Sequence, residues 1–100
     1  MAFYMVTFTY PPNKAKEIGQ TFLSKKNIKL PDYIKQVNVF VVMDNDVKSY
    51  IIYEVENDKT HNALIAIANR FTDYFDIEGS KFKIEPLLTT KEALNLIGLA

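Results

Sequence analysis

The sequence predicts an α+β fold: a four-stranded antiparallel sheet with two helices on one face, followed by a short C-terminal helix. Four segments are rich in β-branched and aromatic residues or alternate between apolar and polar side chains, which is typical of half-buried strands. Two other segments repeat apolar residues at helical spacing. The order is strand, helix, strand, strand, helix, strand, as in two interlocked βαβ units.

The first strand and helix are separated by a pair of prolines. Residues 3–10 are mostly aromatic or β-branched, and the strand ends at Pro11 because proline has no backbone N–H for the sheet. Asn13 can cap the helix that follows. Gly19 lies on the apolar stripe of this helix, where we expect it to allow a close approach to the sheet. The other members of the stripe are Ala15, Ile18, Phe22 and Leu23.

A long hairpin follows, with strands at residues 33–44 and 47–56 around a turn at Asn45 and Asp46. Both turn residues tolerate the left-handed conformation of a tight turn. One face of the hairpin has the composition of an ordinary core: Val37, Val39, Val41, Met43, Ser49, Ile51, Tyr53 and Val55. The other face mixes large apolar with polar groups: Gln36, Asn38, Phe40, Val42, Tyr50, Ile52 and Glu54. Such a mixed face usually meets a partner or lines a cavity.

The second half of the chain repeats the pattern of helix and strand. Asp58 can cap a helix that ends near Asp76, and Gly79 turns the chain into a last strand at residues 80–88. The predicted buried stripe of the helix is Leu64, Ala68, Phe71 and Phe75, with Ile65 and Ile67 at its edges. Residues 89–92 match a capping box, which should start a short helix running to Leu99.

Right-handed crossovers place the first and third strands in the centre of the sheet and both helices on one side. This is a ferredoxin-like βαββαβ arrangement, which we expect to form a single domain over residues 1–100. The uncovered sheet face then receives the mixed face of the hairpin, with Lys83 and Glu85 from the last strand. From the first strand we expect Met5, Thr7 and Thr9 on this face, because the bulkier alternate set belongs under the helices.

Composition narrows the function classes. Lys plus Arg and Asp plus Glu number 12 each, whereas nucleic-acid-binding proteins normally carry a basic excess. The absence of cysteine excludes disulfides, zinc–thiolate sites and thiol catalysis. No segment approaches the roughly 20 apolar residues of a membrane span, and the N-terminus lacks the pattern of a signal peptide. We therefore expect a cytoplasmic protein that binds neither nucleic acid nor membrane and has no metal or cofactor.

The layout, the mixed sheet face and an apolar terminal segment together resemble the dimeric α/β-barrel superfamily. The terminal segment contains Leu94, Leu96, Ile97 and Leu99. The resemblance implies a homodimer whose sheets pack face to face around a central cavity, with a pocket in each subunit. The superfamily includes oxygenases, isomerases, decarboxylases, haem-degrading enzymes and ligand-sensing domains. No residue of this chain indicates which of these functions it has. Burying the large apolar groups of the open face would remove on the order of 400 Å² per subunit, worth roughly 10 kcal/mol before association costs.

Our leading prediction is a small homodimer that binds a partly apolar molecule between its sheets. The predicted ligand-binding residues are Met5, Thr7, Asn38, Phe40, Tyr50 and Ile52. An alternative is a cofactor-independent oxygenase or isomerase, with His61, Tyr50 and Glu54 as catalytic residues. A carboxylate beside a phenol in a half-dry cavity could transfer protons, and a histidine near a helix N-terminus is expected to be neutral.

Each of these candidates also has a structural interpretation. Glu54 could pair with Lys83, or with a lysine across the dimer, and fix the register of the subunits. His61 could simply pack at the rim of its helix. The open face could likewise be filled completely by a partner, which would make the protein a purely structural interaction module. An RNA-binding surface is disfavoured, because Tyr50 and Tyr53 fall on opposite faces of their strand and only one could stack on a base.

Overall fold

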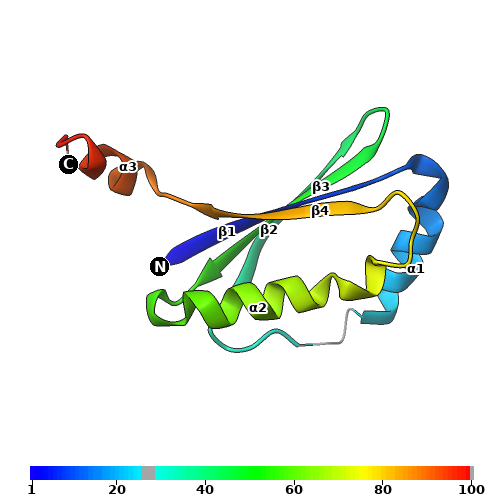
Figure 1. The fold of residues 1–100 in the computed structure, drawn as a ribbon, viewed down its shortest axis with the longest axis horizontal. Coiled ribbons are helices and arrows are strands. Elements are labelled where there is room, and N and C mark those ends of the chain that lie inside the picture. Colours follow the sequence, from blue (N-terminus) through cyan, green and yellow to red (C-terminus); the bar gives the residue numbers. More distant parts are fainter. Residues whose placement is uncertain (26–28, 100) are drawn as a thin grey trace.

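The computed structural model describes residues 1–25 and 29–99. Within them the chain forms an α+β fold with a four-stranded antiparallel sheet and three α-helices, as the sequence predicts (Figure 1). The layout is compatible with a ferredoxin-like one. The elements are β1 (Ala2–Tyr10), α1 (Ala15–Lys25), β2 (Ile34–Met43), β3 (Val47–Val55), α2 (Thr60–Arg70), β4 (Lys81–Leu87) and α3 (Thr90–Leu96).

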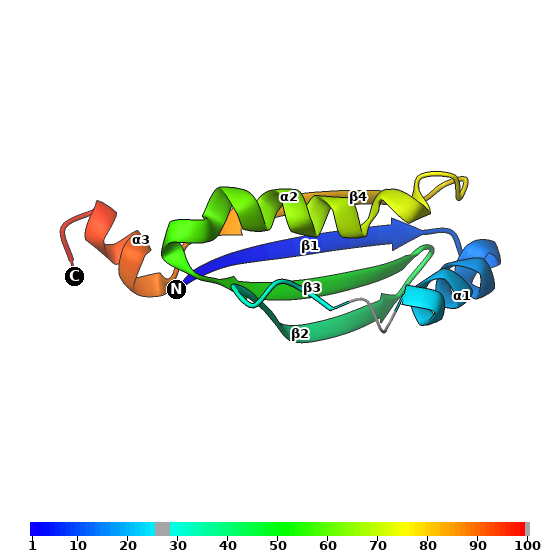
Figure 2. The ribbon, with the colours of Figure 1, turned by 90° about the horizontal axis from the view of Figure 1, so that it is seen from below.

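The strand order is β2-β3-β1-β4, so the first and third strands are central, which confirms the predicted positions. All three neighbouring pairs are antiparallel. The helices α1 and α2 lie on the same side of the sheet (Figure 2). Whereas α2 runs along the sheet, α1 lies towards one end of it. The opposite face of the sheet is not covered by α1 or α2, and we call it the open face.

Both helices begin differently from the prediction. Short 3₁₀ turns, Pro12–Lys14 and Asn57–Lys59, precede α1 and α2. Asn13 and Asp58 lie inside these turns, so neither occupies the predicted capping position at the start of its α-helix. Backbone hydrogen bonds close the turns instead: the N–H of Lys14 donates to Pro11, and the N–H of Lys59 donates to Glu56.

The core lies between the sheet and α2. Its largest fully buried side chains are Tyr53, Ile67, Val6 and Val55. The buried residues are Ala63 and Ile67 on α2, followed by Phe71 and Tyr74 beyond its end. Phe71 is buried as predicted, whereas the other three each precede the predicted Leu64, Ala68 and Phe75 by one residue. The helix α2 ends at Arg70, and the 3₁₀ turn that follows, Thr72–Tyr74, buries Tyr74. Phe75 is consequently exposed and stacks on Phe82, with ring centroids 5.5 Å apart.

The strand β2 departs furthest from the prediction. The pairing with β3 skips Val37: Gln36 faces Tyr53, and Asn38 faces Ile52. This bulge adds one residue to β2 and reverses the facing of everything before it. Gln36 therefore points to the helix side of the sheet, and its predicted place on the open face is wrong.

The far half of β2 was predicted to be core, and that prediction is also wrong. Val39, Val41 and Met43 face the helix side, yet they are exposed, Met43 to 80%. The strand is at the edge of the sheet, and α1 does not cover this part of it.

The open face carries the predicted residues of the other three strands. Thr7 pairs with Tyr50 on one side and with Lys83 on the other, so these three side chains share a face. Met5 lies between Ile52 and Glu85 in the same way, which confirms the choice of Met5, Thr7 and Thr9. Beyond the bulge, Asn38, Phe40 and Val42 also belong to this face.

The terminal helix α3 is short but closed at both ends. Thr89 accepts a hydrogen bond from the N–H of Glu92 and donates its own N–H to the Glu92 carboxylate, which confirms the capping box. The hydrogen bond from the Thr89 N–H, and after it the Thr89 side chain, lower the pKa of Glu92. At the other end Gly98 adopts a φ of 76°, and the N–H of Leu99 donates to Leu94. This C-terminal cap ends the helix at Leu96 instead of Leu99. The helix projects away from the sheet (Figure 1).

Candidate functional site

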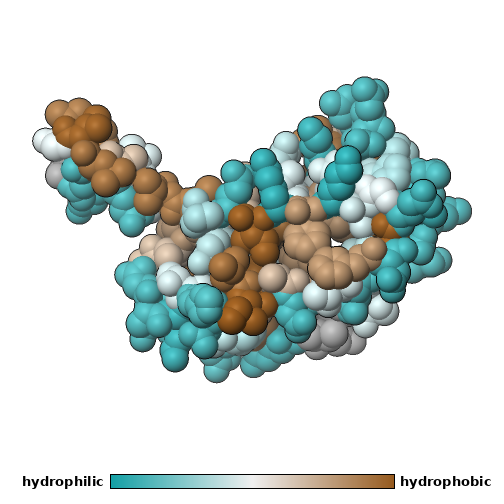
Figure 3. Space-filling model, in the orientation of Figure 1, coloured by the Kyte–Doolittle hydropathy of each residue, from teal (hydrophilic) through white to brown (hydrophobic). Residues whose placement is uncertain are grey.

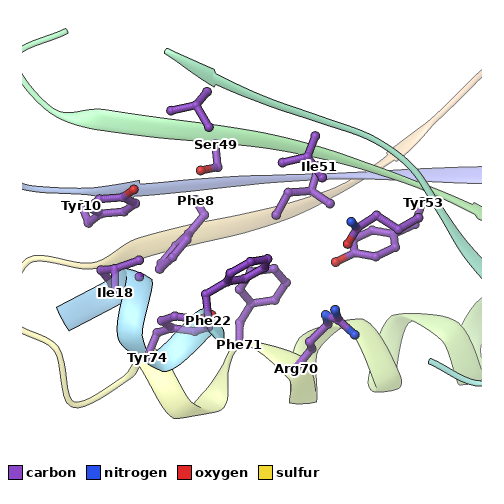
Figure 4. Close-up of a pocket in the computed structure, with 14 residues that line it drawn as sticks. Phe8, Tyr10, Ile18, Phe22, Ser49, Ile51, Tyr53, Arg70, Phe71 and Tyr74 are labelled. Carbon is purple, nitrogen blue, oxygen red and sulfur yellow. The ribbon is translucent and has the colours of Figure 1, made fainter. Parts of the chain in front are cut away.

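A pocket of about 260 Å³, partly open to solvent, lies on the helix side of the sheet and is bordered by the sheet, α1 and the end of α2 (Figure 4). We call it the helix-side pocket. In the space-filling view apolar residues gather between the sheet and α2 (Figure 3). The pocket is lined by Phe8, Tyr10, Ile18, Gly19, Phe22, Gln36, Val39, Val41, Ser49, Ile51, Tyr53, Arg70, Phe71 and Tyr74.

The pocket exists because α1 does not close down on the sheet. Gly19 lies on the pocket wall, and a Cβ built at this position would meet no atom within 4 Å. We expected Gly19 to permit a close approach of helix and sheet, but it borders empty space instead. A larger residue at this position would fill part of the pocket.

One wall of the pocket is an aromatic cluster. The ring of Phe8 lies 4.9 Å from that of Tyr74 and 5.7 Å from that of Phe71, in tilted and edge-to-face arrangements. Tyr10 adds a further contact at 5.4 Å from Phe8. Because aromatic rings have few rotatable bonds and these are packed on one another, the wall is largely preformed. Such a surface suits a flat or branched apolar group.

The other end of the pocket is polar. The Tyr53 side chain is fully buried, and its hydroxyl has no hydrogen-bond partner among the described residues. Burial raises the pKa of Tyr53 to about 12, so the phenol stays protonated and can donate a hydrogen bond. Gln36, which faces Tyr53 across the strands, brings its amide to the same region.

Arg70, the single arginine of the chain, also belongs to this polar end. Its positive charge lowers the pKa of Tyr53 and of Tyr74, although burial outweighs it and raises the pKa of both phenols. Figure 4 shows the guanidinium rising from the end of α2 towards Tyr53. A phenol, an amide and a cation converge on one end of an otherwise apolar space.

The predicted ligand-binding residues lie on the other side of the sheet. Met5, Thr7, Asn38, Phe40, Tyr50 and Ile52 share the open face. The structure brings these six together, and none of them lines the helix-side pocket. Thr7 contributes a buried hydroxyl without a hydrogen-bond partner among the described residues. Their assignment to a ligand stays a prediction.

The predicted catalytic residues are divided between the two sides of the sheet. Tyr50 and Glu54 are on the open face, whereas His61 is an exposed residue in the first turn of α2, on the helix side. His61 is nine positions before Arg70, which is about 13 Å along the helix. His61 is thus remote from the polar end of the helix-side pocket as well.

The structure gives Lys83 a different partner from the predicted one. Its Nζ lies 3.6 Å from Glu85 Oε1 on the same strand. On β1, Lys83 is opposite Thr7, whereas Glu54 is opposite Phe3. The predicted partners Glu54 and Lys83 are therefore four residues apart along this strand.

Sequence reasoning missed the helix-side pocket because its lining residues have the composition of a core. Three signals were present: Gly19 in the middle of an apolar stripe, Ser49 on an apolar strand face, and Arg70 directly before the buried Phe71. Gln36 could not be found in this way, since its facing depends on the bulge.

Residues 1–25 and 29–99 contain no cluster of three or more histidine, cysteine, aspartate or glutamate side chains able to hold a metal ion. No helix within the same residues has the length and apolar character needed to cross a membrane.

Comparisons with known proteins give the fold alone. No family model matches the chain, and no curated protein is similar to it in sequence. Among solved structures it is similar to the de novo designed protein Foldit4, with a TM-score of 0.57. The alignment covers 88% of this chain and 97% of the designed one at 6% sequence identity. Such a match supports a small α+β fold with a four-stranded sheet.

Proposed function

We propose that this protein is a small-molecule-binding module whose ligand occupies the helix-side pocket. The observation that carries the proposal is the preformed apolar space of about 260 Å³ with a few convergent polar groups at one end. Binding sites for small molecules usually have this composition: mostly apolar and aromatic walls, with few polar groups that fix orientation. The volume is just below the ~300 Å³ of the smallest sites for drug-sized ligands, so the ligand is a small one.

The proposal favours binding over catalysis. The groups expected to transfer protons, Tyr50, Glu54 and His61, are not gathered at the helix-side pocket. The pocket itself offers donors of hydrogen bonds and a permanent cation, which orient a ligand but do not exchange protons near neutral pH.

We further propose that the subunit is a ferredoxin-like member of the dimeric α/β-barrel type and that it forms a homodimer through the open face. Support comes from the central positions of β1 and β3 and from the exposed apolar groups of the open face, above all Phe40 at 60% exposure. Stable interfaces bury about 800 Å² per partner and are somewhat more than half apolar. The apolar share of the open face, on the order of 400 Å², is in that range.

A pair of substitutions at Gly19 tests the binding function. Gly19→Leu should fill the pocket, because the side chain would extend into space that is empty next to this residue. Gly19→Ala is the matched control, since it changes the backbone preference in the same way but adds a single methyl group. Both variants and the parent protein are screened against small aromatic and aliphatic compounds by ligand-observed NMR.

Compounds that bind the parent protein and Gly19→Ala should fail to bind Gly19→Leu. If the same compounds bind all three proteins equally, the ligand is held elsewhere and the helix-side pocket is not the functional site. Circular dichroism shows whether each variant retains the parent fold.

A further inference from the structure

The polar end of the helix-side pocket lacks a hydrogen-bond acceptor for the buried hydroxyl of Tyr53. Its side chain is fully buried, it lines the pocket, and its hydroxyl has no partner among the described residues. Figure 4 shows the oxygen directed into the pocket, on the side of Arg70. Buried donors in folded proteins are normally paired, so the geometry requires an acceptor atom at this point. A bound molecule can supply it.

The groups around Tyr53 specify the charge of that acceptor. Arg70 and Gln36 line the same end of the pocket, and both present N–H donors. A guanidinium carries five N–H donors in a planar fork, so it can hold a ligand and donate to another group at the same time. No aspartate or glutamate is among the pocket-lining residues of the described chain. Donors in a lining that contains no acid favour an anion over a cation.

We infer that the ligand is an organic monoacid, with its carboxylate held by Tyr53 and Arg70 and its apolar body packed against the aromatic wall. A carboxylate has two acceptor oxygens, which match the guanidinium fork and leave a lone pair for the phenol. The wall formed by Phe8, Phe71 and Tyr74 favours a ring or branched chain next to that carboxylate. This inference rests on the proposed function, because it names the ligand class of the same site.

A phosphate ester is a poorer match for the same groups. A phosphate monoester carries close to two negative charges at neutral pH and accepts hydrogen bonds through three oxygens. The pocket lining contains one cation, Arg70, and no lysine within the described residues. One guanidinium balances the single charge of a carboxylate. The charge of the site thus points to a monoanion.

The test uses three probes that share one apolar body: 4-phenylbutanoate, 4-phenylbutanamide and 4-phenylbutan-1-ol. Each is titrated into the full chain at pH 7.5 by isothermal titration calorimetry. The acid should bind at least about 10-fold more tightly than the amide or the alcohol, because only the acid pairs a negative charge with the Arg70 guanidinium. Amide shifts in ¹⁵N NMR spectra should appear at the pocket-lining residues and not on the open face.

Three variants locate the effect. Arg70→Met should remove the preference for the acid while the amide and the alcohol still bind. Tyr53→Phe should weaken the acid by about 3- to 10-fold, and it serves if Arg70→Met does not fold. Lys48→Met is the matched control, because it removes one positive charge from the open face, where Lys48 pairs with Val42 and Thr9. This control should change the affinity for the acid by less than about 2-fold.

The outcomes separate the two proposals. Equal affinities for the three probes, or an acid preference that survives Arg70→Met and Tyr53→Phe, would overturn the monoacid inference and leave the pocket as a binding site. Shifts confined to the open face, or the absence of binding by every probe and every compound of the Gly19 screen, would overturn the proposed function itself.

Discussion

Gln36 and Tyr53 face each other across β2 and β3, and both line the helix-side pocket. Their pairing depends on the bulge at Val37, since a regular strand would turn the Gln36 side chain to the open face. The bulge thus brings an amide next to a buried phenol. Bulges often re-aim a side chain next to a functional site in this way.

The alkaline stability of the protein should depend on Tyr53. Its pKa is raised to about 12 in the folded state, against about 10 in an unfolded chain. The folded state therefore favours the protonated phenol, which contributes roughly 3 kcal/mol to the free energy of unfolding. This contribution is complete below pH 10 and is lost as the pH rises towards 12. The free energy of unfolding is measured by urea titration at pH 9 and at pH 11.5. Between these two pH values it should fall more for the parent protein than for Tyr53→Phe.

The comparison with Tyr53→Phe is needed because other groups titrate in the same range. Burial also raises the pKa of Tyr10 and Tyr74. These groups are present in both proteins, so their effects cancel in the difference. Equal losses in the two proteins would show that the Tyr53 phenol ionises as easily in the folded state as in the unfolded one.

Two glycines should respond in opposite ways to alanine. Gly19 is inside α1 with open space around it, so Gly19→Ala should raise the free energy of unfolding by about 0.5–1 kcal/mol. Gly79 has a φ of +85°, and a Cβ there would lie 2.9 Å from Pro11 Cγ. Gly79→Ala should therefore cost about 2 kcal/mol.

Chemical denaturation of both glycine variants measures these changes. Each variant is the control for the other, because the substitution is the same and only the backbone environment differs. A loss of stability in Gly19→Ala would mean that α1 packs more closely on the sheet than the structure has it.

The proposed homodimer predicts a specific effect at Phe40. This side chain is 60% exposed on the open face, so Phe40→Lys would bring a charge into each half of the interface. Light scattering coupled to size exclusion should give a dimer mass for the parent protein and a monomer mass for Phe40→Lys. Ile65→Lys is the control, since Ile65 is similarly exposed, at 58%, but lies on α2.

A dimer mass for Phe40→Lys together with a monomer mass for Ile65→Lys would move the interface to the helix side. A parent protein that is monomeric at all concentrations would rule out a dimer through the open face.

The parts of the fold that local patterns determine could be predicted from the sequence. Alternation in the strands and the capping box at Thr89 depend on neighbouring residues only, and both are found in the structure. The central position of β1 follows from the handedness of the crossovers, which is a general property of right-twisted sheets. The face that carries Met5 followed from the bulk of its alternate neighbours.

The remaining features depend on small local insertions and on packing. The bulge at Val37 has no signal in the sequence of this valine-rich strand, yet it decides to which face of the sheet Gln36 points. The 3₁₀ turn after Arg70 rotates the chain so that Tyr74, and not Phe75, is buried. The position of α1 away from Val39 and Val41 opens the helix-side pocket, and helical periodicity carries no information about such a distance. The candidate site was missed for this reason.

The edge position of β2 has a consequence for the behaviour of the protein at high concentration. From Asn38 to Met43 this outer strand is exposed and carries neither charge nor proline, the features that usually prevent strands of different molecules from joining. A dimer formed through the open face would leave this edge unpaired. Fibrils of this protein, if grown, should therefore have their ordered spine in residues 38–43.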